Sequence, residues 1–185
     1  VDADPTPEIV TSSGYVLNGE TRAVEWHYVN GFGARVALGD FDGDAMQEII
    51  GAAAWSKVTA FDADIKSPKW EVPYQLDIAA MKVADIDGDA VPEVLVGEGQ
   101  WGRVYAHDGA TGAVKWSIAN PEHGVTDVAA GDVDGDGGIE VIWGAGWSST
   151  GPDYLFVSDV AGGFREWQSR HLDGPFMTEV ADVDN

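Results

Sequence analysis

The sequence predicts an all-β chain built as a β-propeller of four-stranded antiparallel blades. An acidic segment, Asp-x-Asp-Gly-Asp-x-x-x-Glu, recurs three times and begins at Asp40, Asp85 and Asp132. A tryptophan recurs in the same phase, at Trp26, Trp70, Trp116 and Trp167. No window of ten or more residues shows a helical apolar period between caps. Short strands in repeats of about 40 to 50 residues are typical of propeller blades.

Within one repeat the strands follow from alternating apolar residues bounded by turn residues. Residues 93–96, 103–106, 113–118 and 125–132 are the expected strands, and 108–112 is a turn rich in Gly and Asp. The last of these strands leads into the next acidic segment. Equivalent strands are expected at 15–19, 57–62 and 154–159, each followed by its in-phase tryptophan.

The domain organisation follows the same repeat. We expect a single propeller domain or a propeller fragment over residues 1–185, with repeats at approximately 1–39, 40–84, 85–131 and 132–181 and a further motif starting at 182–185. One blade is split between the termini, and residues 177–184 are candidates to pair beside 8–12. Three arrangements stay open: a closed four-bladed ring, two chains that complete an eight-bladed ring, or part of a longer propeller.

The composition limits the classes of partner. The 185 residues carry 32 acidic and 10 basic side chains, for a net charge of −22. Such a surface repels nucleic acid and anionic membranes, so we expect neither partner. There is no apolar run long enough to span a bilayer, and the absence of cysteine excludes disulfides and thiolate metal sites.

The acidic segments are predicted to bind Ca²⁺. Four carboxylates in a tight loop repel one another unless a cation lies among them, and a hard cation such as Ca²⁺ prefers oxygen ligands. The predicted ligands are Asp40, Asp42, Asp44, Glu48, Asp85, Asp87, Asp89, Glu93, Asp132, Asp134, Asp136 and Glu140. Incomplete copies at the two ends of the chain add Asp2, Asp4, Glu8, Asp182 and Asp184. We expect three to four structural ions.

The sixth position of the loops distinguishes the three complete copies. It is occupied by Ala45, Ala90 and Gly137. If this position requires a positive φ, the two alanines are strained, and binding to their loops is weaker than binding at Gly137.

The acidic segment followed by an apolar strand resembles the FG-GAP/VCBS repeats of integrin-α-like propellers. That resemblance implies propeller blades whose loops bind calcium. Residues 104–116 are similar to the blade motif of quinoprotein-like propellers, in which the turn and the tryptophan lock adjacent blades. Propellers of these kinds serve adhesion, sugar binding, assembly and polysaccharide cleavage, so the resemblance specifies architecture better than function.

The tryptophans divide into two sets. Trp26, Trp70, Trp116 and Trp167, together with Trp143, are expected in the core. Trp55, Trp101 and Trp147 each follow the strand after an acidic segment, in Gly-rich connections. Aromatic side chains gathered on one face suit a sugar or a protein partner, and the alternative is that they fill gaps between blades.

These features favour a non-enzymatic, calcium-stabilised recognition or adhesion module for a glycan or protein. We expect it outside cells, where calcium is millimolar. No catalytic residues are assigned, because His27, His107, His123 and His171 share no motif. The alternatives are a polysaccharide lyase similar to rhamnogalacturonan lyases and a structural subunit of a larger assembly; self-association that completes a larger propeller is a further expected interaction.

Overall fold

The computed structural model describes residues 6–146 and 153–183, and its elements are all strands. They form four antiparallel meander sheets. The first sheet contains β1 (Glu8–Val10), β2 (Tyr15–Asn18) and β3 (Val24–His27). The second contains β4 (Arg35–Gly39), β5 (Glu48–Ala53), β6 (Lys57–Asp62) and β7 (Ser67–Pro73). The third contains β8 (Ile78–Ala84), β9 (Glu93–Glu98), β10 (Arg103–Asp108) and β11 (Val114–Ala119). The fourth contains β12 (Val125–Gly131), β13 (Glu140–Ala145), β14 (Leu155–Asp159) and β15 (Phe164–Gln168).

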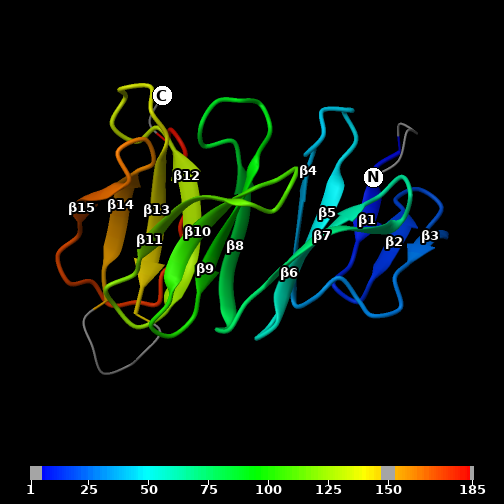
Figure 1. Ribbon diagram of the computed structural model, residues 1–185, viewed down its shortest axis with the longest axis horizontal. Coiled ribbons are helices and arrows are strands. Elements are labelled where there is room, and N and C mark those ends of the chain that lie inside the picture. The colour runs from blue at the N-terminus through cyan, green and yellow to red at the C-terminus, as the bar shows by residue number, and fades with distance from the viewer. Residues whose placement is uncertain (1–5, 147–152, 184–185) are drawn as a thin grey trace.

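These sheets confirm the predicted all-β, propeller-type architecture. They stand side by side in chain order, with the first sheet at one end of the row and the fourth at the other (Figure 1). The leading strands β4, β8 and β12 contact one another in turn. Each complete sheet begins with the strand that precedes an acidic loop, so the sheets are offset by one strand from the loop-to-loop repeat of the sequence. No helix in the described ranges is long and apolar enough to cross a membrane.

The core lies between the sheets, in three clusters that follow the row. The cluster between the third and fourth sheets includes Trp143, Phe156 and Leu95, all fully buried. The other two clusters are centred on Phe41 and Ile50, and on Trp26 and Phe61. Each sheet therefore depends on its neighbours to bury its apolar faces, as expected of stacked repeats.

The in-phase tryptophans occupy equivalent places in the four sheets. Each pairs with a residue of the preceding strand: Val16 with Trp26, Ala60 with Trp70, Ala106 with Trp116, and Val157 with Trp167. In every pair the register shifts at this point, so the residue just before each tryptophan is the extra residue of a β-bulge. We call this the bulge position.

Most of these tryptophans pack as predicted. Trp26 and Trp116 are buried, and Trp70 packs against the cluster around Phe41. The Nε1 of Trp70 also donates a hydrogen bond of 2.8 Å to the carbonyl of Gly109, in the turn of the next sheet. This contact joins two adjacent blades through a turn and a tryptophan.

The core prediction for Trp167 is wrong. Its side chain is 52% exposed, because it lies on β15, the outer strand of the last sheet in the row, where no further sheet is described to cover it. The prediction for Trp143 is confirmed, with 0% exposure.

The suggested pairing of residues 177–184 beside 8–12 is not what the structure shows. The described end of the chain runs along β12 instead: the amide of Thr178 donates to Asp127 Oδ2 at 2.7 Å, and Val180 lies against Gly131. The first strand, β1, and the last described segment lie at opposite ends of the row (Figure 1). The closed four-bladed ring is therefore excluded for this structure, and the other two arrangements stay predictions.

Candidate metal centres and a candidate recognition face

The three acidic loops connect the first and second strands of the complete sheets. We call residues 40–48, 85–93 and 132–140 the first, second and third acidic loops. In each, the first Asp accepts two backbone hydrogen bonds: Asp40 Oδ1 from Gly43 at 2.7 Å, and Asp40 Oδ2 from Ala45 at 2.9 Å. Asp85 and Asp132 make the same pair of contacts. The first Asp thus fixes the loop, and its oxygens keep lone pairs for a cation.

The last Glu of each loop is a buried carboxylate. Glu48, Glu93 and Glu140 are each at most 4% exposed. Their Oε2 atoms accept hydrogen bonds of 2.8 to 2.9 Å from the amides of Phe41, Ile86 and Val133, respectively. Burial raises the pKa of the Glu48 and Glu93 carboxyl groups, since desolvation disfavours the charged form. A buried carboxylate of this kind needs a cationic partner.

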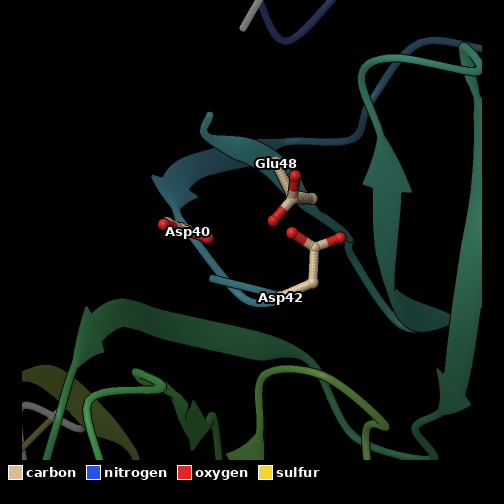
Figure 2. A group of neighbouring side chains, drawn as sticks. All are labelled: Asp40, Asp42 and Glu48. Atoms are coloured by element: carbon tan, nitrogen blue, oxygen red, sulfur yellow. The ribbon is translucent and has the colours of Figure 1, made fainter. Parts of the chain in front are cut away.

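In each loop three carboxylate groups converge, with ligand oxygens within 4.8 Å of one another. The groups are Asp40, Asp42 and Glu48; Asp85, Asp87 and Glu93; and Asp132, Asp134 and Asp136. Figure 2 shows the first group, whose side chains lie around a common space. Nine of the twelve predicted ligands are thus brought together.

The other predicted ligands are placed differently. Asp44 and Asp89 accept hydrogen bonds of 2.8 Å from the amides of Met46 and Val91, and Glu140 lies outside the third group. Glu8 begins β1, and Asp182 lies in the last described segment; neither belongs to a converging group among the described residues. Asp2, Asp4 and Asp184 lie outside the described residues.

The donor set fits Ca²⁺. The converging ligands are carboxylate oxygens in all three loops, and Ca²⁺ binds six to eight oxygens at about 2.3 to 2.6 Å. Two oxygens on opposite sides of such an ion are separated by about 4.6 to 5.2 Å. Ligand oxygens that lie within 4.8 Å of one another are close enough for one ion to contact all three carboxylates of a group.

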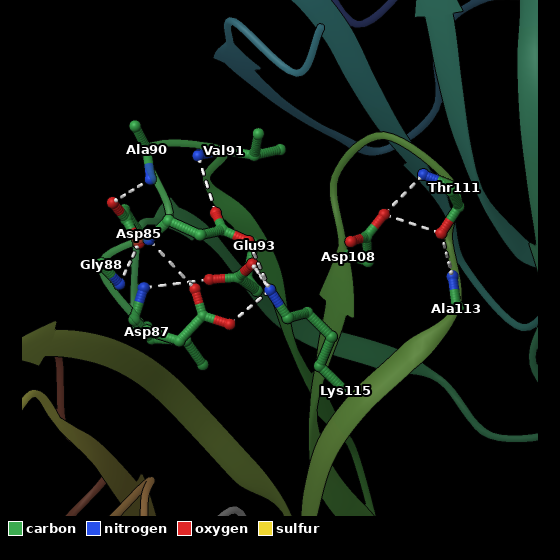
Figure 3. A network of polar contacts seen from close by, with 12 residues as sticks. Asp85, Asp87, Gly88, Ala90, Val91, Glu93, Asp108, Thr111, Ala113 and Lys115 are labelled. Atoms are coloured by element: carbon green, nitrogen blue, oxygen red, sulfur yellow. Dashed lines mark hydrogen bonds and ion pairs between the residues drawn. The ribbon is translucent and has the colours of Figure 1, made fainter.

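Two lysines reach into these loops, although neither belongs to the acidic motif. Lys69 Nζ lies 2.8 Å from Asp42 Oδ2, and its hydrogen bond lowers the pKa of Asp42. Lys115 Nζ contacts Asp87 and lies 3.1 Å from Asp89 and 2.9 Å from Glu93 (Figure 3). Both lysines immediately precede an in-phase tryptophan, which is the sequence signal that would have found them.

The sixth loop position has a positive φ in all three copies: 71° at Ala45, 69° at Ala90 and 91° at Gly137. A left-handed conformation costs an L-residue roughly 1 to 2 kcal/mol, whereas glycine adopts it freely. The first two loops therefore carry backbone strain that the third does not.

Replacing either alanine with glycine is expected to stabilise the protein. Ala45→Gly and Ala90→Gly should each raise the free energy of unfolding by about 1 kcal/mol and Tm by about 2 to 4 °C, measured in EGTA to exclude metal effects. Ala161→Gly is the control, since Ala161 is an exposed turn residue without a positive φ. A lower Tm for Ala90→Gly would show that the strain is not relieved by glycine.

The predicted recognition tryptophans lie at the opposite ends of the strands from the acidic loops. Trp55 is in the β5–β6 connection and Trp101 in the β9–β10 connection, and they are 56% and 69% exposed. Trp101 also makes an edge-to-face contact with His123, at 5.3 Å between ring centroids. Trp147 lies outside the described residues. The exposure of Trp55 and Trp101 does not suit the alternative role of filling gaps between blades.

A pocket of about 400 Å³ lies between the second and third sheets. Tyr74, Tyr105 and the carboxylate of Glu98 line it. Glu98 is 7% exposed, its Oε2 accepts a hydrogen bond of 2.9 Å from the amide of Arg103, and burial raises its pKa. Aromatic rings beside a carboxylate suit a polar ligand with an apolar face, such as a sugar.

His107, which also lines the pocket, has both ring nitrogens engaged. Its Nδ1 lies 3.0 Å from the carbonyl of Gly112, so Nδ1 carries the proton, and Nε2 accepts from the hydroxyl of Tyr74. Burial lowers the pKa of His107, in keeping with this neutral form. The ring therefore holds the turn and Tyr74 in place.

Comparison with known proteins identifies a repeat family for part of the chain and solved structures with a similar fold. No curated protein sequence matches this chain. The V. cholerae biofilm matrix protein Bap1 is 25% identical with a TM-score of 0.50, over 62% of this chain and 20% of Bap1. BamB from Moraxella catarrhalis is 18% identical with a TM-score of 0.55, over 89% of this chain and 46% of BamB. BBS1N, solved in complex with ARL6DN, is 14% identical with a TM-score of 0.59, over 88% of this chain and 62% of BBS1N.

The chain thus spans a fifth of the length of Bap1, and BamB and BBS1N inform on the fold alone. Residues 85–143 match the FG-GAP-like repeat family. This segment runs from the first residue of the second acidic loop to Trp143 and includes the whole third loop. Residues 85–143 are therefore similar to an FG-GAP-like repeat, and the chain has a β-propeller-type fold.

Proposed function

We propose that this chain is a calcium-stabilised, extracellular β-propeller that acts as a non-enzymatic recognition or adhesion module for a glycan or a protein. The observation that carries the proposal is the separation of two features. Converging carboxylates occupy one end of the strands, and the exposed Trp55 and Trp101 occupy the other. Ions at the first end can stabilise the sheets while the second end stays accessible to a ligand.

The calcium role is structural. Ions that bind only the folded chain add about 2.7 kcal/mol per site when the free ion is a hundredfold above Kd. Each loop joins the first two strands of a sheet, so an ion there holds the end of the blade together. The similarity to a biofilm matrix protein supports an extracellular setting, in which millimolar calcium fills sites of modest affinity.

The binding role rests on the exposed tryptophans and on the pocket between the second and third sheets. Exposed indole rings supply large contact areas at low cost in conformational entropy, and they stack on sugar rings or anchor protein partners. The pocket adds Tyr105 and the Glu98 carboxylate, which can bind hydroxyl groups. A ligand that enters this pocket would contact the second and third sheets together.

Replacing Trp55 and Trp101 with Ala is expected to abolish binding without unfolding the protein. A glycan array and a protein pull-down, both in millimolar Ca²⁺, identify a ligand, and titration then compares the variants. Each substitution should weaken binding at least about tenfold, as expected for a buried aromatic anchor.

The matched control is Trp167→Ala, because Trp167 is equally exposed at 52% but lies on β15. It should bind as the wild type does. Unchanged binding by the Trp55→Ala/Trp101→Ala double variant, with an unchanged Tm, would remove this face from the proposed function.

A further inference from the structure

The pocket between the second and third sheets contains a carboxylate that departs from the repeat of the chain. β5, β9 and β13 each begin at the last Glu of an acidic loop and run for six residues. The sixth residue is Ala53 in β5 and Ala145 in β13, but it is Glu98 in β9, where it lines the pocket. One sheet therefore carries a carboxylate where the other two complete sheets carry a methyl group.

Two further residues of the pocket differ from their counterparts in the same way. His107 is the second-last residue of β10, and its counterparts in β6 and β14 are Phe61 and Ser158. Tyr74 follows β7, and the residue that makes the same backbone hydrogen bond after β11 is Asn120. Three departures from the repeat thus meet in one pocket. Local departures from a regular pattern are expected at functional sites.

The Glu98 carboxylate has no cationic partner in the described chain. It is 7% exposed, and the amide of Arg103 donates to its Oε2. The guanidinium group of Arg103 points elsewhere, with Nη2 3.0 Å from Ser117 Oγ. Among residues 6–146 and 153–183, no Lys or Arg forms an ion pair with Glu98. Because a buried carboxylate is costly without a cation, the pocket suits a ligand that supplies one.

Two tyrosine rings stand beside this carboxylate. The rings of Tyr74 and Tyr105 are nearly perpendicular, at 85°, and their centroids are 5.7 Å apart. Burial and then the charge of Glu98 raise the pKa of both hydroxyl groups, so Glu98 lies close to both rings. The face of an aromatic ring attracts a cation within about 6 Å of its centroid. The rings and the carboxylate therefore favour the same kind of ligand, a positively charged group.

The remaining lining suits an aliphatic stem better than a sugar. The apolar side chains that line the pocket are Val72, Pro73, Leu76 and Val114. The Tyr74 hydroxyl and His107 Nε2 are already hydrogen-bonded to each other. A sugar would bury several hydroxyl groups that each need a partner, whereas an alkylammonium group needs a carboxylate and an apolar wall. The net charge of −22 also attracts a basic protein.

We propose that this pocket binds the side chain of a lysine on a protein partner. The ammonium group pairs with Glu98 beside Tyr74 and Tyr105, and the aliphatic stem lies against Val72 and Val114. The inference rests on the proposed recognition role and selects one of its two partner classes, a protein that presents an exposed lysine. Glu98 sets the specificity of the pocket for a cation.

NMR titration of the isotope-labelled full chain with Nα-acetyl-lysine methylamide, in millimolar Ca²⁺, tests this assignment. Saturable shifts are expected at the amides of Glu98, Tyr105 and Val114. Nα-acetyl-norleucine methylamide has the same stem without the ammonium group and should bind at least about tenfold more weakly. Glucose and glucosamine should also bind more weakly than the lysine derivative, because neither has an aliphatic stem.

Glu98→Ala gives β9 the residue that β5 and β13 carry, so the variant should fold. It should weaken binding of the lysine derivative at least about tenfold and lower Tm by no more than about 2 °C. Glu98→Gln should weaken binding by a similar factor. The matched control is Glu20→Gln, which removes the same charge from an exposed turn after β2 and should change the affinity less than about twofold.

Four results would overturn the inference. They are the absence of saturable shifts with the lysine derivative, equal binding of the norleucine derivative, binding that survives Glu98→Ala, and an equal loss in Glu20→Gln. Tighter binding of glucose or glucosamine would reassign the pocket to a sugar. The proposed function would survive each of these results if a ligand found by screening still depended on Trp55 and Trp101.

Discussion

Removing divalent cations with EGTA is expected to lower Tm by at least about 5 to 10 °C from its value in millimolar Ca²⁺. One site held at a hundredfold excess over Kd contributes about 2.7 kcal/mol. For a chain of this size 1 kcal/mol corresponds to roughly 2 to 4 °C. The physical reason is local: without an ion, the converging carboxylates of each loop repel one another.

The control for this experiment is magnesium. Mg²⁺ demands near-ideal octahedral geometry at shorter distances and loses its water reluctantly, so it should restore little of the lost stability. Re-addition of Ca²⁺ should restore all of it. An unchanged Tm on chelation would mean that the loops are solvated turns, and the extracellular assignment would lose its main physical support.

Trp143→Ala is expected to lower the free energy of unfolding more than any other single substitution proposed for this chain. Trp143 is fully buried between the third and fourth sheets, packs on Phe156 at 5.2 Å between ring centroids, and donates to Asn120. Large-to-small changes of this kind cost about 3 to 5 kcal/mol, because a cavity remains. Thermal or urea unfolding should therefore show a Tm lower by at least about 6 °C.

Trp167→Ala is the matched control, since it deletes the same side chain from a position that is 52% exposed. Its expected cost is below about 1 kcal/mol. If both variants lost the same stability, the core would not lie between the third and fourth sheets as described, or Trp167 would be covered by a further element in solution.

The sequence alone was sufficient for the strands and for most of the loop geometry. These features are predictable because each is encoded by a short sequence pattern. An apolar run such as 93–96 follows each acidic segment, and the in-phase tryptophans mark the outer strands. The convergence of Asp132, Asp134 and Asp136 also followed from spacing, because alternate residues in a tight turn face a common centre. Such features depend on short stretches of chain.

Features that depend on contacts between distant strands were not predicted. Lys115 meets Glu93 only because a bulge in β11 redirects its side chain, and the loop motif does not encode that register. The burial of Trp167 was predicted from its phase, but burial requires a neighbouring sheet that the repeat pattern does not guarantee. The path of the last described segment along β12 likewise depends on how the sheets are arranged.

The presence of calcium in the loops is tested most directly by diffraction from crystals grown in millimolar Ca²⁺, with an anomalous map collected at long wavelength. We expect calcium peaks among the converging carboxylates of the three loops, and those in the first two loops require that Lys69 and Lys115 move away from Asp42 and Glu93. A map without a peak in any of the three loops is incompatible with calcium as the structural ion of this propeller.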